Sequence, residues 1–102
     1  MTSLMDYNTY IVGQLILLRD DITDPESTPP FQTIDDATDQ ATVYQPDGST
    51  ISPTTVHDGA AGSGVYLAQF APTQTGWHHY VFRSTATAVG AGRWKFYVSP
   101  VP

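Results

Sequence analysis

Hydrophobic and polar residues alternate along much of the chain with the two-residue period of β-strands. Two groups of apolar side chains each fall on one face of a predicted strand: Tyr66, Ala68 and Phe70 in the first, and Trp94, Phe96 and Val98 in the second. No stretch shows a convincing 3.6-residue period, and eight Pro and eight Gly leave little uninterrupted length for a helix. The pattern therefore predicts an all-β protein.

Turn signals divide the chain into about seven predicted strands. These strands cover residues 7–12, 14–23, 37–45, 50–57, 65–70, 77–84 and 93–98. Gly13 separates the first two, and a glycine in this position marks a bulge or a switch between sheets. Pro53 indicates that 50–57 is an edge strand, and the tetrapeptide Pro-Asp-Gly-Ser at 46–49 predicts a tight turn. Strands at this spacing are typical of an antiparallel β-sandwich or a small barrel.

The length of 102 residues suits one domain that can bury a core without covalent staples. We expect a flexible tail at residues 1–6 and a single domain over 7–102. Residues 24–36 are expected to form a long acidic connection, which carries three prolines. The absence of cysteine excludes a disulfide scaffold, a thiolate zinc site and a cysteine nucleophile.

Charge is distributed unevenly along the chain. Residues 1–60 hold all ten acids and one Arg, a net charge of −9, whereas residues 61–102 hold three cations and no acid. The acidic whole argues against nucleic-acid binding, which needs many cationic contacts to phosphates. The asymmetry allows electrostatic contact between copies or with a partner, although folding could also simply mix the charges. The candidate partner-binding residues are Arg83, Arg93, Lys95, Asp20 and Asp21.

The chain carries no sign of a membrane or export segment. Its longest near-apolar run, residues 11–18, is far shorter than the ~20 residues of a membrane helix. The N-terminus lacks the basic and apolar regions of a signal peptide. We therefore expect a protein that is made and assembled in the cytosol, without a membrane partner.

The histidines do not predict an enzyme. His57 has no histidine near it in sequence, and the adjacent His78 and His79 point to opposite faces of their strand, so they cannot easily bind one metal ion. No GxSxG or HExxH motif is present. We expect neither catalysis nor a cofactor.

Acidic residues bracket the proline-rich connection and form a weak candidate calcium site. The candidate ligands are Asp24, Asp35, Asp36 and Asp39. Hard cations such as Ca²⁺ take several oxygen ligands, but the spacing matches no EF-hand loop. Solvated turn residues explain the same cluster equally well, since Asp favours turns.

Four aromatic residues near the C-terminus suggest a second kind of binding site. Trp77, Tyr80, Trp94 and Tyr97 could stack against sugar rings in a carbohydrate-binding module. The alternative is that they form the core and rim of the sandwich, as aromatic residues commonly do.

Three stretches of the chain resemble the short Ig-like domains of tailed-phage virion proteins. They are Tyr-Ile-Val-Gly at 10–13, Pro-Asp-Gly-Ser at 46–49, and Gly-Val-Tyr-Leu-Ala-Gln-Phe-Ala-Pro-Thr at 64–73 followed by Thr-Gly-Trp at 75–77. The resemblance covers roughly residues 7–98 and implies an Ig-like antiparallel β-sandwich. Extracellular and adhesin-type Ig-like repeats share two of these elements. The acidic connection at 24–36 departs from the pattern because it is longer than a simple sandwich turn needs.

The resemblance implies a non-enzymatic structural role and transfers no catalytic residues. We expect a capsid decoration or cement protein that binds the head surface. Its partners would be the major capsid protein or head–tail proteins, with copies in a homo-oligomer or symmetric array. The expected location is the virion, after assembly in the bacterial cytoplasm. The alternatives are a head–tail connector component and a carbohydrate-binding Ig-like module.

Overall fold

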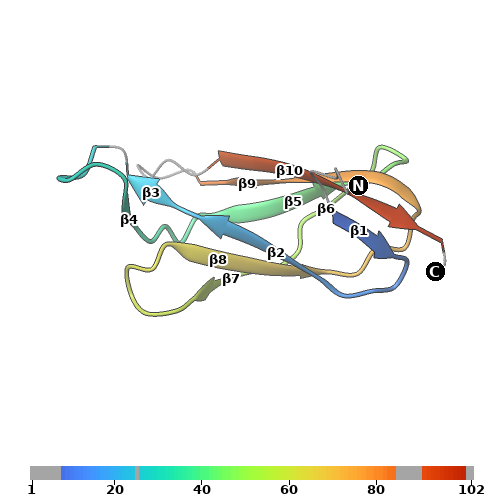
Figure 1. The fold of residues 1–102 in the computed structure, drawn as a ribbon, viewed down its shortest axis with the longest axis horizontal. Helices are drawn as coiled ribbons and strands as arrows, with labels where there is room; N and C mark the ends of the chain where they lie inside the picture. Colours follow the sequence, from blue (N-terminus) through green and yellow to red (C-terminus); the bar gives the residue numbers. More distant parts are fainter. Residues whose placement is uncertain (1–7, 25, 85–90, 101–102) are drawn as a thin grey trace, which may run out of the picture.

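The computed structural model describes residues 8–24, 26–84 and 91–100. Two layers of β-strands face one another along the long axis of the molecule (Figure 1). The strands are β1 (Asn8–Ile11), β2 (Ile16–Asp21), β3 (Thr23–Asp24), β4 (Gln32–Thr33), β5 (Gln40–Tyr44), β6 (Thr50–Ile51), β7 (Thr55–Asp58), β8 (Val65–Phe70), β9 (Gly76–Arg83) and β10 (Ala91–Ser99). Seven of these segments have four or more residues, in agreement with the predicted number.

The first layer is a five-stranded sheet in the order β1-β10-β9-β5-β6, and the second is a three-stranded sheet in the order β2-β8-β7. A separate two-stranded hairpin pairs β3 with β4. The strand pairs are antiparallel except for β1 and β10, which run parallel, with Asn8 opposite Phe96 and Ile11 opposite Ser99. The predicted antiparallel sandwich therefore includes one parallel pair, at the edge of the five-stranded sheet.

The chain changes sheets at Gly13, a predicted switch, and at Pro53, the predicted mark of a single edge strand. Gly13, with φ 86°, lies in the turn that takes the chain from β1 in one sheet to β2 in the other. Its N–H donates to the carbonyl oxygen of Pro72 at 2.9 Å. Pro53 lies between β6 and β7, so the single strand predicted over 50–57 is two short strands in different sheets. Proline has no N–H to donate to a ladder, which explains the break at this position.

The connection predicted over 24–36 contains regular structure. Thr23 pairs with Thr33 and Asp24 with Gln32 in the β3–β4 hairpin. The base of the hairpin is tied to the sandwich, because the N–H of Ile22 donates to the carbonyl oxygen of Gly64 at 2.8 Å. Gly64 has φ 70°, and a Cβ there would lie 2.5 Å from the carbonyl oxygen of Ile22. Only glycine permits this close approach.

The core lies between the two layers and is formed by the alternate positions of their strands. It contains Ile16, Leu18, Ile22, Ala41, Val43, Tyr66, Ala68, Phe70, Phe82, Phe96 and Val98. The predicted inward group Tyr66, Ala68 and Phe70 is confirmed, and Phe96 and Val98 are buried as expected.

The limits of the described residues affect two predictions. The predicted tail at 1–6 lies outside them, as does most of the predicted loop at 85–92, and β10 begins at Ala91 rather than at the predicted residue 93. Within 8–24, 26–84 and 91–100, no helix is long and apolar enough to cross a membrane.

Candidate functional site

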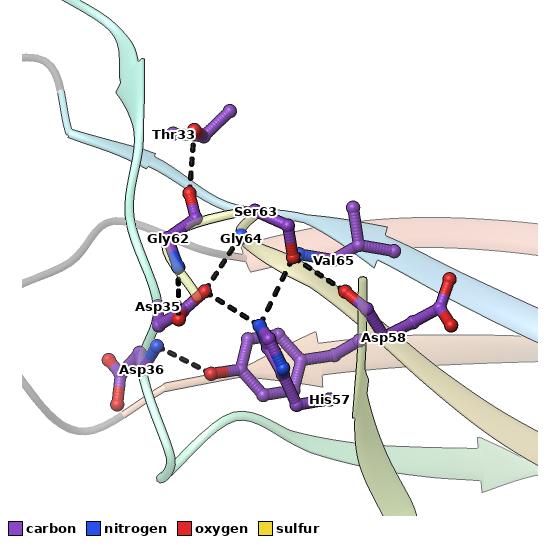
Figure 2. A network of polar contacts seen from close by, with 10 residues as sticks. Thr33, Asp35, Asp36, His57, Asp58, Gly62, Ser63, Gly64 and Val65 are labelled. Atoms are coloured by element: carbon purple, nitrogen blue, oxygen red, sulfur yellow. Dashed lines mark hydrogen bonds and ion pairs between the residues drawn. The ribbon is translucent and has the colours of Figure 1, made fainter. Parts of the chain in front are cut away.

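A serine, a histidine and an aspartate meet at the end of the three-stranded sheet (Figure 2). Nε2 of His57, on β7, lies 2.9 Å from Oδ1 of Asp35 and 3.1 Å from Oγ of Ser63. Asp35 and His57 are 22 residues apart in the sequence, and this spacing matches no motif from which their contact could be predicted. Serine, histidine and aspartate are the residues of a hydrolytic triad. Whether these three could catalyse hydrolysis depends on which atoms of the histidine ring the other two contact.

The geometry of this cluster is not that of a triad. A triad needs the serine at one ring nitrogen of histidine and the carboxylate at the other. Here both groups approach Nε2 of His57. The hydroxyl of Ser63 donates to the carbonyl oxygen of Asp58 at 2.5 Å and accepts the N–H of Val65 at 3.3 Å. Its proton is therefore directed away from any base that could activate the oxygen as a nucleophile.

The cluster instead fixes the loop between β7 and β8. Oδ2 of Asp35 accepts the N–H of Gly62 at 2.6 Å, and Oδ1 accepts the N–H of Gly64 at 2.8 Å. These two backbone donors, followed by His57, hold the pKa of Asp35 below its usual value. Nearby, the hydroxyl of Tyr66 accepts the N–H of Asp36 at 2.8 Å. The contacts anchor the segment around residue 35 to the sandwich.

The structure does not bring the four calcium candidates together. Asp24 accepts the N–H of Glu26, and Asp35 accepts the N–H groups of Gly62 and Gly64. Asp36 accepts the N–H and hydroxyl of Thr38 and the hydroxyl of Ser84. Among the described residues, no three His, Asp or Glu side chains converge as ligands of a metal ion.

Asp39, the fourth candidate, belongs to a buried acidic pair. Asp39 is 5% exposed and Asp20, on the inward side of β2, is 4% exposed. Burial, followed by the hydrogen bond and charge of Asp20 and the charge of Asp36, raises the pKa of Asp39 to about 8. Asp20 is one of the predicted partner-binding residues, but its carboxylate faces the interior. Asp21 does lie on the surface, where it accepts from Arg19 at 3.0 Å.

The three late cations all project from the outer face of the five-stranded sheet. Arg83 follows Trp77, His79 and Val81 on the outward positions of β9, whereas the intervening residues point to the core. On the neighbouring strand β10, Arg93 lies opposite Val81 and Lys95 lies opposite His79. Among the described strand residues that point outward from this sheet, none is acidic.

The same face carries a group of aromatic rings. His79 stacks on Tyr44 of β5 with ring centroids 4.6 Å apart and planes 10° apart. Trp77 is 45% exposed and meets Tyr97 edge to face at 5.3 Å. Nζ of Lys95 lies 5.1 Å from the centroid of the Trp77 ring, a distance that gives a cation–π contact. We call these five residues, together with Arg83 and Arg93, the cationic–aromatic face.

A hollow of about 360 Å³ opens on this part of the molecule and is lined by His79, Arg93, Trp94 and Lys95. Trp94 occupies an inward position of β10 and stacks on Tyr80 at 5.0 Å, with its ring 39% exposed at the rim. The four aromatic residues proposed as a sugar platform are thus divided between the two sides of the sheet. The two on the outer face are tilted 68° to each other and form no coplanar surface.

His78 and His79 point to opposite sides of β9, as their adjacency predicts. His78 is 1% exposed and stacks on Phe96 at 5.1 Å with planes 13° apart. Burial lowers the pKa of His78, which favours the neutral ring in the core. His79, by contrast, is part of the cationic–aromatic face.

The outer face of the three-stranded sheet has a different character. It exposes Leu17 and Val56, at 59% and 54%, with Asp21 and Asp58 nearby on the outward positions of β2 and β7. Of the remaining described acids, Asp20, Asp36 and Asp39 are buried, Asp24 lies on β3, and Glu26, Asp35 and Asp47 lie in turns and loops. The two outer faces thus differ in charge. Arg83, Arg93 and Lys95 lie on the five-stranded sheet without an acid on its described strands, whereas Arg19, Asp21 and Asp58 share the outer face of the three-stranded sheet.

Comparison with solved structures identifies the fold class. No family model matches the chain, and no curated protein matches it. Among solved structures, the chain is similar to the filamin domain of Lin-41, with a TM-score of 0.59 and 16% sequence identity over 93% of this chain and 86% of that one. The fold is an Ig-like β-sandwich. The predicted fold class is thereby confirmed, and an identity this low extends the likeness to the fold only.

Proposed function

We propose that this protein is a non-enzymatic docking module, a structural protein of a tailed-phage virion that decorates the capsid. The docking surface is the cationic–aromatic face. The supporting observation is that Arg83, Arg93 and Lys95 share one sheet face with exposed aromatic rings, and that no acid projects from the described strands of that face. Such a surface favours an acidic partner, by attracting it at long range and by rejecting basic ones.

The residue types on this face are those that dominate binding energy at protein interfaces. Trp, Tyr and Arg are enriched among interface hot spots, which cluster where water is excluded. Trp77 is held by Tyr97 and by the overlying ammonium group of Lys95. A ring fixed in this way loses little side-chain entropy when a partner covers it.

The size of the face argues for many weak contacts rather than one strong contact. Its five strands contain 28 residues. At about 3.3 Å per residue and about 4.8 Å between strands, their ladder covers roughly 440 Å². A standard interface buries about 800 Å² of accessible surface on each partner, so a contact confined to a footprint of this size is at most a small interface. Repetition over a symmetric capsid lattice multiplies such contacts into stable attachment.

The polar cluster around His57 supports a non-enzymatic role. Ser63 and Asp35 compete for one ring nitrogen, and the cluster serves as an anchor for backbone N–H groups. A head–tail connector component would use the same docking chemistry and differs only in where the protein sits in the virion.

A carbohydrate-binding module is the second candidate. The exposed ring of Trp77 beside Lys95 favours it, since an acidic sugar could stack on the ring while its carboxylate meets the ammonium group. The division of the four aromatic residues between two sides of the sheet argues against a broad sugar platform.

The test is co-sedimentation with purified phage heads, combined with mass spectrometry of purified virions. We expect the wild-type protein to pellet with heads and the double variant Arg93→Glu/Lys95→Glu to stay in the supernatant. Leu17→Ser, on the opposite sheet face, is the matched control and should pellet normally. Absence of the protein from virions would overturn the decoration role. Binding to a glycan panel without binding to heads would favour the carbohydrate module.

A further inference from the structure

The β3–β4 hairpin is a braced structure rather than a loose loop. The hydroxyl of Ser27 lies 2.9 Å from the carbonyl oxygen of Asp24 and 2.6 Å from that of Pro29, and it accepts the N–H of Gln32 at 3.1 Å. The N–H of Phe31 donates to the carbonyl oxygen of Asp24 at 2.7 Å. The hairpin projects beyond the end of both sheet layers (Figure 1). Its tip can therefore reach another molecule without rearrangement of the fold.

The hairpin presents an aromatic side chain to solvent. Phe31 is 66% exposed, more than any other large hydrophobic side chain described in the structure. Its φ is 65°, a left-handed conformation that is rare for a bulky residue. Residues in such conformations cluster at ligand-binding and switch regions of proteins.

The surroundings of Phe31 are acidic. Asp24 and Glu26 lie on the same hairpin, Asp35 follows it, and residues 22–39 contain no Lys or Arg. The side chain of Glu26 is exposed. A hairpin that carries an exposed ring and an exposed carboxylate is the complement of a surface that combines cations with aromatic rings.

The cationic–aromatic face of the same protein has these complementary properties. Its hollow of about 360 Å³ is lined by Arg93 and Lys95 together with His79 and Trp94, so an inserted ring would contact aromatic walls and be flanked by positive charge. Phe31 supplies the ring, and Glu26 supplies a carboxylate for the cations. Both halves of the contact are thus present on one chain, on different parts of its surface.

We propose that the cationic–aromatic face, where it is not seated against the capsid, binds a second copy of this chain, whose Phe31 occupies the hollow. The inference rests on the docking face assigned above. Because the hairpin of one copy meets the sheet of the next, the contact is head to tail and joins two different surfaces. Two joined copies keep a free hairpin at one end and a free face at the other, so further copies can add until the assembly closes into a ring or extends as an open array.

The test is sedimentation velocity over a concentration series at low salt. We expect the weight-average sedimentation coefficient of the wild type to rise with concentration and the rise to shrink on addition of salt. Phe31→Gly should weaken self-association at least tenfold while leaving the fold intact, since glycine accepts a φ of 65° without strain. Leu17→Ser and Val56→Ser, two exposed apolar positions on the other sheet, are controls and should associate as the wild type does.

A charge exchange tests the pairing of surfaces. Glu26→Lys and Lys95→Glu should each weaken association, and a chain carrying both substitutions should regain it, because reversed charges then meet between copies. A wild type that stays monomeric throughout the series would overturn the proposal, as would unchanged association of Phe31→Gly.

The experiments distinguish failure of the homotypic contact from failure of the proposed capsid role. Binding to heads that is lost in Arg93→Glu/Lys95→Glu but kept in Phe31→Gly, in a protein that does not self-associate, would leave the docking face in place and remove only the homotypic contact. Self-association of a protein that is absent from virions would remove the capsid role and keep the homotypic contact.

Discussion

The buried acidic pair makes the stability of this protein depend on pH in a direction opposite to that of most carboxylates. Asp39 is 5% exposed and lies beside the carboxyl of Asp20, which is 4% exposed. Burial and then the neighbouring carboxyl of Asp20 raise its pKa to about 8. The folded protein therefore keeps the Asp39 proton at neutral pH, and the neutral acid can donate to Asp20.

The magnitude follows from linkage between proton binding and folding. In the unfolded chain an Asp loses its proton near a pH of about 3.9. Between that pH and about 8, the folded state holds one proton more than the unfolded state. The free energy of unfolding then falls by up to about 1.4 kcal/mol for each pH unit. The stabilising contribution is complete below the unfolded pKa and is lost as the pH rises through the folded pKa. From about pH 5 to about pH 8, the loss approaches 4 kcal/mol.

Asp39→Asn removes this titration while its amide can still donate to Asp20. We expect the unfolding free energy of wild type minus that of Asp39→Asn to fall steadily from pH 5 to pH 8. Urea unfolding followed by tryptophan fluorescence gives both values, and the titration of His78 cancels because both proteins contain it. Asp21→Asn, on the exposed side of the same strand, is the control and should give a flat difference. Parallel profiles for wild type and Asp39→Asn would refute the reasoning.

Three further outcomes follow from positions already described. Gly64→Ala places a Cβ against the carbonyl oxygen of Ile22 at a φ of 70°; we expect a loss of about 2–3 kcal/mol, visible as a lower melting temperature. Phe31→Gly relieves a left-handed φ and should raise the unfolding free energy by about 0.5–1 kcal/mol; a lower melting temperature would contradict this account of the strain. Asp35→Ala removes the acceptor of two backbone N–H groups, so hydrogen exchange at Gly62 and Gly64 should become faster. In the wild type their protection should persist below the usual pKa of Asp, because the pKa of Asp35 is lowered; loss of protection already above that pKa would contradict the anchor.

The faces of the sheets could be predicted from the sequence because they depend on local alternation. A two-residue period assigns Trp77 and His79 to one side of β9 and Tyr80 to the other, whichever strands lie beside it. The same rule brings Arg83 to the side of Trp77. Whether Arg93 and Lys95 share that side depends on how β10 pairs with β9. Alternation within one strand does not determine this pairing.

Contacts between distant segments could not be predicted in this way. The bond between Asp35 and His57 and the pairing of Asp39 with Asp20 arise only when loops and strands from different sheets are packed together. A rule that places Asp in solvated turns describes Asp35 but fails for Asp39, which tertiary packing buries. The hairpin within 24–36 was missed for another reason: its strands have two residues each, too short for any alternation to show.

The central claim is that the cationic–aromatic face is the docking surface of a virion protein, and co-sedimentation with purified heads tests it most directly. Wild type, Arg93→Glu/Lys95→Glu and Leu17→Ser are compared at equal concentration and low salt. The account predicts that the wild type and Leu17→Ser pellet with heads and that the charge-reversed protein stays in solution. Equal pelleting of all three, or no pelleting of the wild type, would contradict it.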